Sequence, residues 1–312
     1  MSYIIIGREE YAEMKIDPRA IQLFLAVYRA KSISGAARDQ AISQPAVSVA
    51  IAQLERALGA KLFDRHRTGI KLTREGAALL RHAEAMANTI DAARKEVNLT
   101  HNDIAGPLVV GGTPGALATV VPRAVEAMRT ATPRIQMRVL ARSDLELYEL
   151  LRNFTIDLAV VTVGADERPD DIKEIKLETD PFSLIVGVAN AQMPDNTSLK
   201  RLKDASWVMP EAAGAFRRQI DALFISAKVP VPLNVIRSDS LLTTKAIVRR
   251  TDYVTILPRL VAEPEIGTGQ LRAIKIREAK ADRSVGIIHL ADRDLSGPAE
   301  TFVKYAKNRG KT

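Results

Sequence analysis

The 312-residue chain contains no cysteine, and this absence excludes several kinds of chemistry. Without thiols there is no disulfide, no thiolate ligand for a metal and no thiol-based redox sensing. Histidine is also scarce. The four histidines, His66, His82, His101 and His289, are scattered along the sequence and suggest neither a metal cluster nor a catalytic triad. We therefore expect no metal site and no cofactor.

The common catalytic signatures are missing as well. The sequence has no GxSxG elbow, no Walker-type lysine motif and no GxGxxG fingerprint. GGTPG at Gly111–Gly115 is by itself a poor phosphate-binding signature. We expect no catalytic residues, and the protein is not predicted to be an enzyme.

Long hydrophobic runs are absent too. No apolar stretch approaches the roughly 18 residues that a membrane span needs. The opening MSYIIIG is short and is followed by Arg8, Glu9 and Glu10, which is unlike a signal peptide. An apolar fraction of 46% with mean hydropathy of −0.04 is typical of a soluble protein with two or three domains. We expect a cytoplasmic protein with no membrane partner.

Positive charge is concentrated toward the N-terminal part of the chain. Residues 14–105 hold 14 Lys and Arg against 9 Asp and Glu, whereas residues 106–312 hold 30 against 25. The same net charge of +5 is therefore spread over less than half the length in the first segment. A basic module of this kind suits phosphate binding, although charge alone is a weak indication.

The stretch Ser32–Glu55, SISGAARDQAISQPAVSVAIAQLE, has the pattern of two short helices joined by a tight turn. Apolar steps of four, three and four predict one buried face on the second helix: Val47, Ile51, Leu54 and Leu58. The opposite face is then free for a partner: Gln44, Pro45, Ser48, Val49 and Ala52. We expect Ser34 to cap the first helix and Ser43 the second. The pattern is typical of a helix-turn-helix whose second helix enters the DNA major groove.

From about Ile16 to Thr73 the sequence resembles the DNA-binding domain of LysR-type transcriptional regulators. FLAVYRAKSISGAARDQAISQPAVSVAIAQLERALGAKLFDRHRTGIKLTREG carries the SQPA run, the spaced serine, the leucine-glutamate pair and the LFxR segment of that family. Where the family often has arginine after the second serine of the recognition helix, this chain has Val49, which could pack on a thymine methyl. The DNA-binding residues expected from the pattern and the resemblance are Ser34, Ser43, Gln44, Pro45, Ser48, Val49, Gln53, Arg65 and Arg67.

A basic hairpin is predicted directly after the recognition helix. Gly59 should end that helix, and Thr68-Gly69 should form the tip between two short extended arms. Basic side chains cluster on this wing: Arg65, His66, Arg67 and Lys71. They suit contacts with phosphates or the adjacent minor groove, and the alternative is a solvated basic loop.

A long helix is predicted from Thr73, as N-cap, to about Asn98. Apolar residues recur in it with heptad spacing: Leu79, Ala83, Met86, Ile90, Ala93 and Val97. The same helix of a second copy would bury this seam, which predicts a homodimer that presents two recognition helices to a two-fold site. The alternative is that the stripe packs on its own domain.

Beyond Asn102–Pro107, NDIAGP, strand and helix patterns alternate. Strands are expected at 108–111, 135–140, 157–161, 182–188, 207–209, 231–236, 254–257 and 285–290, with helices at 116–130 and 144–153. These predict a parallel α/β sheet with right-handed crossovers. GPLVVGG, Pro122, Ile156-Asp157 and TDYVTILP followed by GTGQL resemble landmarks of the LysR effector domain. That resemblance implies two lobes like those of periplasmic binding proteins.

The two lobes should hold a ligand where strands end and helices begin. GGTPGA offers Thr113 and Gly115, and ARSDLE offers Ser143 and Asp144. Ser143 with Glu146 is also a capping box, and the structural role is slightly favoured. Pro210 and the Arg217-Arg218 pair follow the Trp207 strand, where an arginine could clamp a carboxylate, and Ser238 opens a later helix. The predicted effector-binding set is Thr113, Gly115, Ser143, Asp144, Pro210, Arg217 and Ser238.

The predicted fold is α/β with an N-terminal all-α winged helix-turn-helix and a C-terminal two-lobed domain. Its predicted parts are an extension at 1–14, the DNA-binding domain at 15–73, a dimerisation helix at 74–105 and an effector domain at 106–308. Lobe I is expected at about 106–162 and 266–308, and lobe II at 163–265.

The predicted function is that of an effector-responsive transcriptional regulator acting as a homodimer or homotetramer. Its partners would be double-stranded DNA, a small-molecule effector such as a metabolite, and RNA polymerase as a further candidate. The alternatives are a small-molecule-binding or enzymatic α/β domain whose head serves only for dimerisation, and nonspecific DNA packing.

Overall fold

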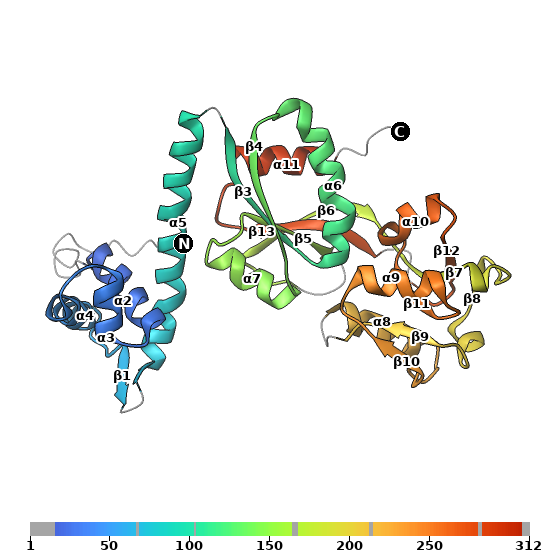
Figure 1. Ribbon diagram of the computed structural model, residues 1–312, viewed down its shortest axis with the longest axis horizontal. Helices are drawn as coiled ribbons and strands as arrows, with labels where there is room; N and C mark the ends of the chain where they lie inside the picture. Colours follow the sequence, from blue (N-terminus) through green and yellow to red (C-terminus); the bar gives the residue numbers. More distant parts are fainter. Residues whose placement is uncertain are drawn as a thin grey trace, which may run out of the picture. The chain divides into compact units, whose positions relative to one another are not determined.

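The computed structural model describes residues 16–66, 69–102, 104–163, 168–211, 215–279 and 283–307, without the side chains of Arg65 and Ala215 (Figure 1). The extension predicted at residues 1–14 lies outside these ranges. The chain divides into two compact units, Met1–Lys95 with Arg152–Thr155 and Glu96–Leu151 with Ile156–Thr312. No helix within the described ranges is long and apolar enough to cross a membrane.

The first unit is a winged helix-turn-helix followed by a long helix. Its elements are α2 (Pro18–Ala30), α3 (Ile33–Asp39), α4 (Gln44–Leu58), β1 (Phe63–His66), β2 (Gly69–Leu72) and α5 (Arg74–His101). The core is centred on Phe24 and Val27 of α2, Val47 and Leu54 of α4, and Leu62. The predicted inner face of α4 is therefore confirmed, with Leu58 only partly buried at its end. β1 and β2 pair in antiparallel register, which confirms the hairpin.

Helix caps fix where the helices of this unit begin. Ser43 caps α4 as predicted, because its hydroxyl accepts the N–H of Ala46 at 3.3 Å. The prediction for α3 is wrong by two residues. Ser32 is the cap, accepting the N–H of Gly35 at 2.9 Å, since the helix already begins at Ile33. Ser34 therefore lies inside the first turn of α3.

The heptad seam of α5 divides into two parts with different surroundings. Ala83 is fully buried, and Leu79 packs against the same core of the first unit. For these two residues the alternative holds, because helix α5 packs them against its own domain and not against a second copy. Farther along, Ala93 is exposed and Val97 is 73% exposed.

Lobe I of the second unit is a five-stranded sheet with helices on both faces. Its elements are β3 (Ala105–Gly112), α6 (Pro114–Ala131), β4 (Ile135–Ala141), α7 (Asp144–Arg152), β5 (Leu158–Val163), β6 (Ile172–Thr179), β13 (Ser284–Leu290) and α11 (Gly297–Lys307). The strand order is β4-β3-β5-β13-β6. β4, β3 and β5 are parallel as predicted, but β13 runs antiparallel to both of its neighbours. The sheet is therefore mixed.

Alternation along the strands of lobe I assigns each side chain to one of two cores. Leu158 and Val160 pack with α6 and α11, whereas Ala159 and Val161 pack with α7. In Figure 1, α7 accordingly lies on the opposite side of the sheet from α6 and α11. A strand that is covered on both faces reads as a continuous apolar run, which is why this strand was recognisable in the sequence.

Lobe II is a second mixed sheet, in the order β10-β9-β11-β7-β12-β8. Its strands are β7 (Phe182–Gly187), β8 (Asn196–Thr197), β9 (Trp207–Met209), β10 (Val235–Arg237), β11 (Val254–Pro258) and β12 (Leu271–Ile276). Its helices are η1 (Val188–Asn190), η2 (Leu199–Leu202), α8 (Ala215–Ser226), α9 (Leu241–Arg250), η3 (Arg259–Ala262) and α10 (Glu263–Gly267). The strand expected at 231–236 is confined to Val235–Arg237.

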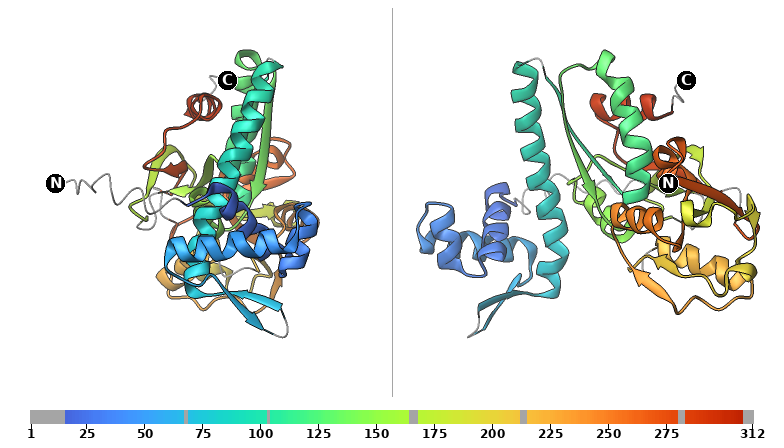
Figure 2. Two further views of the ribbon diagram at one scale, coloured as in Figure 1. Left: turned by 90° about the vertical axis from the view of Figure 1, so that its left-hand side faces the viewer. Right: turned by 45° about the vertical axis from the view of Figure 1, so that its right-hand side comes forward.

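The chain crosses between the lobes at two adjacent points. Asp180 and Pro181 connect β6 to β7, and the return runs between β12 and β13 (Figure 2). The two crossings are joined where the N–H of Asp180 donates to the carbonyl of Arg283 at 2.8 Å. The predicted crossings were wrong, since Thr162 lies inside β5 of lobe I and Ile266 lies in α10 of lobe II.

Candidate functional site

Four helices begin around one cavity between the two lobes of the second unit. α6 and α7 follow β3 and β4 of lobe I, and α8 and α9 follow β9 and β10 of lobe II. The cavity has a volume of about 660 Å³ and is lined by the first residues of these helices. Helix N-termini present free N–H groups, so this arrangement is suited to holding a polar ligand. We call this cavity the cleft.

Lobe I contributes all four of the residues that the sequence predicted from it. Thr113, Gly115, Ser143 and Asp144 line the cleft. The hydroxyl of Thr113 makes no capping hydrogen bond to α6. Ser143, in contrast, donates its hydroxyl and its N–H to Glu146 at 2.6 and 3.0 Å, as the capping-box alternative expected. These two hydrogen bonds lower the pKa of the Glu146 carboxyl.

Lobe II contributes two of its three predicted residues. Pro210 and Ser238 line the cleft, but Arg217 does not. The guanidinium of Arg217 donates to the carboxylate of Asp221, one turn along α8, at 2.8 Å and to the carbonyl of Pro210 at 3.1 Å. The prediction of Arg217 as a ligand clamp is therefore wrong, because a same-face carboxylate engages it. Its neighbour Arg218 lines the cleft instead.

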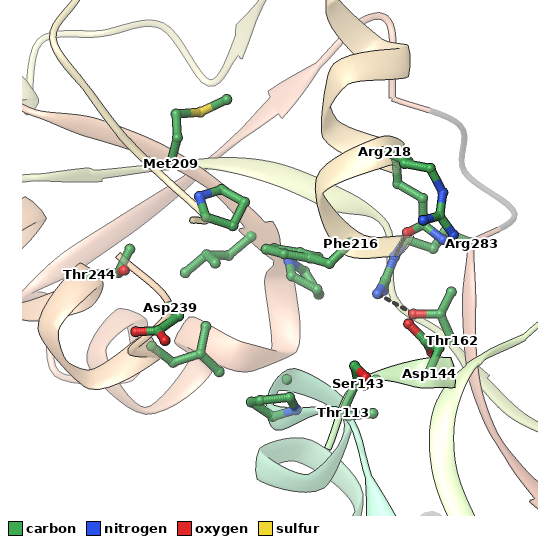
Figure 3. A pocket seen from close by; sticks show the side chains of 18 of the residues that line it. Thr113, Ser143, Asp144, Thr162, Met209, Phe216, Arg218, Asp239, Thr244 and Arg283 are labelled. Atoms are coloured by element: carbon green, nitrogen blue, oxygen red, sulfur yellow. Dashed lines mark hydrogen bonds between the residues drawn. The ribbon is translucent and has the colours of Figure 1, made fainter. Parts of the chain in front are cut away.

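Arg283 lies in the wall of the cleft at the crossing between the lobes. Its guanidinium donates to the hydroxyl of Thr162 in lobe I at 2.7 Å (Figure 3) and to the carbonyl of Asp180 at 2.8 Å. It also lies 4.6 Å above the ring centre of Phe182 in lobe II. Burial lowers the pKa of Arg283 and raises the pKa of Asp180, whose carboxylate is 3.8 Å away. A buried pair of opposite charges thus connects the crossing to the cleft.

Two threonines on the lobe II side open into the cleft without a partner. Thr244 of α9 and Thr255 of β11 are 6% and 2% exposed, and both line the cavity. Among the described residues neither side-chain hydroxyl has a hydrogen bond. Asp239, in the loop before α9, also lines the cavity. In Figure 3, Thr244 and Phe216 lie across the cavity from Thr113, Ser143 and Asp144.

Thr255 and Arg283 were not predicted from the sequence, because of where they lie in the fold. Thr255 sits inside the apolar run of β11, and Arg283 directly precedes β13, so neither belongs to a strand-to-helix loop. A polar residue that interrupts an otherwise apolar strand pattern could have indicated Thr255. The position of Arg283 depends on the pairing of the last strand with the middle of lobe I.

The outward face of α4 in the first unit carries the residues predicted to contact DNA. Gln44 and Pro45 are exposed, Val49 is 53% exposed, and Ser48 is half-buried. The hydroxyl of Ser34 donates to the side-chain oxygen of Gln44 at 3.0 Å. Ser34 of α3 thereby holds the side chain of Gln44 at the start of α4.

Of the remaining predicted DNA contacts, two lie on or next to α4 and two belong to the predicted wing. Ser43 is exposed but is occupied as the cap of α4, and Gln53 is exposed on α4. The side chain of Arg65 and the whole of Arg67 lie outside the described residues. His66 and Lys71 are exposed on β1 and β2.

Metal binding has no support in the parts of the chain that are described. No group of three or more His, Cys, Asp or Glu side chains in those ranges could hold an ion.

Comparison with known protein families gives two matches that together span most of the chain. Residues 18–77 match the profile described as bacterial regulatory helix-turn-helix protein, lysR family. Residues 101–311 match the profile of the LysR substrate binding domain. The two matched segments correspond to the winged helix-turn-helix and to the pair of lobes.

Individual relatives extend over the full length of this arrangement. The regulator GbpR of Azospirillum brasilense is 27% identical over 293 residues, covering 93% of this chain and 86% of GbpR. PcaQ of Agrobacterium fabrum is 26% identical over 296 residues, 94% of each chain.

Two solved structures have a similar fold. Full-length CbnR complexed with its target DNA has a TM-score of 0.66 at 20% identity and covers 93% of this chain and 99% of that chain. A variant of full-length OxyR from Pseudomonas aeruginosa has a TM-score of 0.67 at 19% identity and covers 93% of this chain and 94% of that chain.

Proposed function

The chain belongs to the LysR family of bacterial transcriptional regulators, and from this premise we propose how its two units divide the work. The protein is a DNA-binding regulator with an effector-binding domain. We assign sequence recognition to the outward face of α4 and effector recognition to the cleft. The observation that carries the second assignment is the convergence of four helix N-termini on one 660 Å³ cavity.

On the DNA side, Gln44, Pro45, Ser48 and Val49 contact base edges in the major groove. The amide of Gln44 can pair bidentately with adenine, and the methyl groups of Val49 suit thymine. Ser34, Gln53, Arg65 and Arg67 hold the sugar-phosphate backbone, with Ser43 fixing the start of α4. The structure of full-length CbnR in complex with its target DNA supports a similar mode for this chain.

The protein acts as a homodimer or homotetramer in the cytoplasm. Two copies related by a two-fold axis would place two recognition helices on a two-fold related site. A second copy would cover the rest of the α5 seam, in which Met86 and Ile90 are half-buried and Ala93 and Val97 are exposed. RNA polymerase is a further partner where the regulator activates transcription, and no catalytic step is part of the mechanism.

Effector binding changes the protein by linkage. A small molecule that binds one arrangement of the lobes more tightly shifts the population toward it, and with it the geometry of the DNA-binding heads. Thr113, Gly115, Ser143, Asp144, Pro210 and Ser238 form part of the site, with Arg218 in place of Arg217.

Footprinting on the promoter upstream of its own gene tests the DNA assignment. Purified protein should protect a discrete operator, and affinity should fall steeply with salt. Competing random DNA should bind about 10³-fold or more weakly at physiological salt. A head that served only for dimerisation, or nonspecific packing of DNA, would give no discrete protection at any salt concentration.

A further inference from the structure

Three threonines that line the cleft have hydroxyls without a hydrogen bond among the described residues, whereas the hydroxyls of Ser143 and Thr162 are engaged. Thr244 and Thr255 are more than nine-tenths buried, line the cavity, and have no side-chain hydrogen bond in the described part of the chain. Thr113 faces them from lobe I with its hydroxyl unused as a cap. A hydroxyl is both donor and acceptor, so an unpartnered hydroxyl in the wall of a cavity fits a ligand group that can donate and accept.

The arginines of the cleft are already engaged. Arg168 donates to the carboxylate of Glu174 and to the hydroxyl of Tyr148. Arg283 is paired with Asp180, and the charge of Asp144 also acts on it. Arg218 is engaged within the chain as well. An anionic ligand would therefore have to compete with these partners.

One carboxylate of the cleft, that of Asp239, is not engaged by any of these arginines. Asp239 is exposed toward the cavity and has no ion pair or hydrogen bond within the described ranges. It would repel an anion, while the three guanidiniums would repel a cation. A neutral hydroxyl group can instead donate a charge-assisted hydrogen bond to this carboxylate.

An apolar platform completes the lining. Met209, Phe216, Leu241 and Leu257 line the lobe II side of the same cavity. The volume of about 660 Å³ lies within the range of roughly 300–1,000 Å³ that small-molecule sites occupy. Such a surface suits the carbon-hydrogen face of a ring whose edges carry polar groups.

We propose that the effector is an uncharged polyhydroxylated molecule of the sugar or sugar-alcohol class. Its hydroxyls pair with Thr113, Thr244, Thr255 and Asp239, and its apolar face lies on Phe216. This inference rests on the cleft being the effector site, as proposed above.

The test is a matched panel measured on the full-length protein by thermal shift and calorimetry. Each neutral aldopentose, aldohexose and alditol is compared with its own acid and amine, for example D-glucose with D-glucuronate and D-glucosamine. We expect a neutral member to raise the Tm by several degrees, and its charged counterparts to bind at least tenfold more weakly.

Substitutions in the cleft give a result whose sign depends on ligand charge. Asp239→Asn should weaken the binding of a neutral polyol by about tenfold, because a charge-assisted hydrogen bond becomes a neutral one. The same substitution should strengthen binding of an anion, because it removes a repulsion. Thr244→Val should weaken the polyol similarly. Asp204→Asn, at an exposed position of lobe II that does not line the cleft, is the matched control and should change nothing.

The outcomes separate this inference from the proposed function. Preferential binding of an acid or amine, strengthened or unaffected by Asp239→Asn, overturns the ligand class but retains the cleft as the effector site. If a metabolite of another class raises the Tm and Thr244→Val reduces that increase, the ligand class is again overturned and the cleft is retained as the effector site. A protein stabilised by no member of any class overturns both.

Discussion

At the scale of single residues, the cleft and the crossing between the lobes share one guanidinium. Arg283 is a part of the cleft wall and is also paired with Asp180, which is 3% exposed. Because burial raises the pKa of Asp180, the native state takes up a proton more readily than the unfolded chain does. The contribution of Asp180 to stability therefore falls as pH rises through the interval between its ordinary and its raised pKa.

Removing Arg283 should make this pH dependence steeper. Arg283→Met leaves a buried carboxylate without its counter-charge, which should cost about 3–5 kcal/mol at neutral pH. The cost should shrink as pH falls and Asp180 becomes protonated. Urea unfolding at several pH values measures it, and the double variant Arg283→Met with Asp180→Asn should recover part of the loss. A cost that is the same at every pH would count against the pairing.

The hydrogen bond between Ser34 and Gln44 leads to a graded prediction on the DNA side. Gln44→Ala should cost about 1–3 kcal/mol of operator binding and little on random DNA. Ser34→Ala should cost less, because it removes one backbone contact and releases the side chain of Gln44 without removing it. Arg67→Ala should weaken binding to all sequences alike and reduce the salt slope by about one. Titrations on operator and random DNA measure all three, and equal losses on both for every variant would contradict the assignment.

Sequence reasoning located the loops of the cleft but not all of its side chains. Thr113 and Ser143 were predictable because each stands where a strand pattern gives way to a helix pattern. Thr255 and Arg283 were not, because strand pairing between distant segments brings them there. Arg217 was a wrong prediction, since the sequence alone did not reveal that Asp221 would engage it.

At the scale of elements, the sequence predicted apolar strands such as β5 and missed strands of mixed polarity such as β6 and β12. β5 is an apolar run, and its sequence was recognised. β6, with the sequence IKEIKLET, lies at the edge of its sheet and is half polar, so it carried no clear signal. The sequence also did not predict that the sheet of lobe I is mixed. The antiparallel strand β13 pairs with β6, and β6 itself was not predicted.

Two positions of the α5 seam, Ala83 and Val97, differ in burial and should therefore respond differently to the same substitution. Ala83→Asp should unfold or strongly destabilise the first unit, since Ala83 is fully buried there. Val97→Asp should leave the folding of that unit unchanged and weaken self-association, because Val97 is 73% exposed. Thermal unfolding and sedimentation measure the two effects separately.

The pair Met86→Lys with Ile90→Lys tests the middle of the same seam. It should give monomeric or aggregated protein. An intact dimer in sedimentation, for this pair and for Val97→Asp, would refute the dimer assignment.

At the scale of the whole molecule, the effector and the operator must influence each other equally. If the effector changes operator affinity by a given factor, operator DNA must change effector affinity by the same factor. A typical coupling of about 1–3 kcal/mol corresponds to roughly 5–150-fold. Calorimetry of effector binding with and without operator, set beside operator titrations with and without effector, checks this equality. Unequal factors would mean that the two measurements do not report a single linked equilibrium.

The helix-turn-helix was more fully predictable from the sequence than the lobes, because the two halves depend on different kinds of contact. The helix-turn-helix depends on caps, a short turn and one apolar stripe, all of which are local in sequence. The lobes depend on which distant strands pair, so the predicted crossings at Thr162 and Ile266 missed the true ones beside Asp180 and Arg283.

The strand order of lobe I has a consequence for synthesis of the protein. β13, which lies between β5 and β6, is the last strand to leave the ribosome, after all of lobe II. Lobe II can therefore assemble on the nascent chain while lobe I still has a gap in its middle. A stop codon just before Ser284 would thus be expected to yield a folded lobe II attached to a lobe I that cannot close, and protease should digest the latter first.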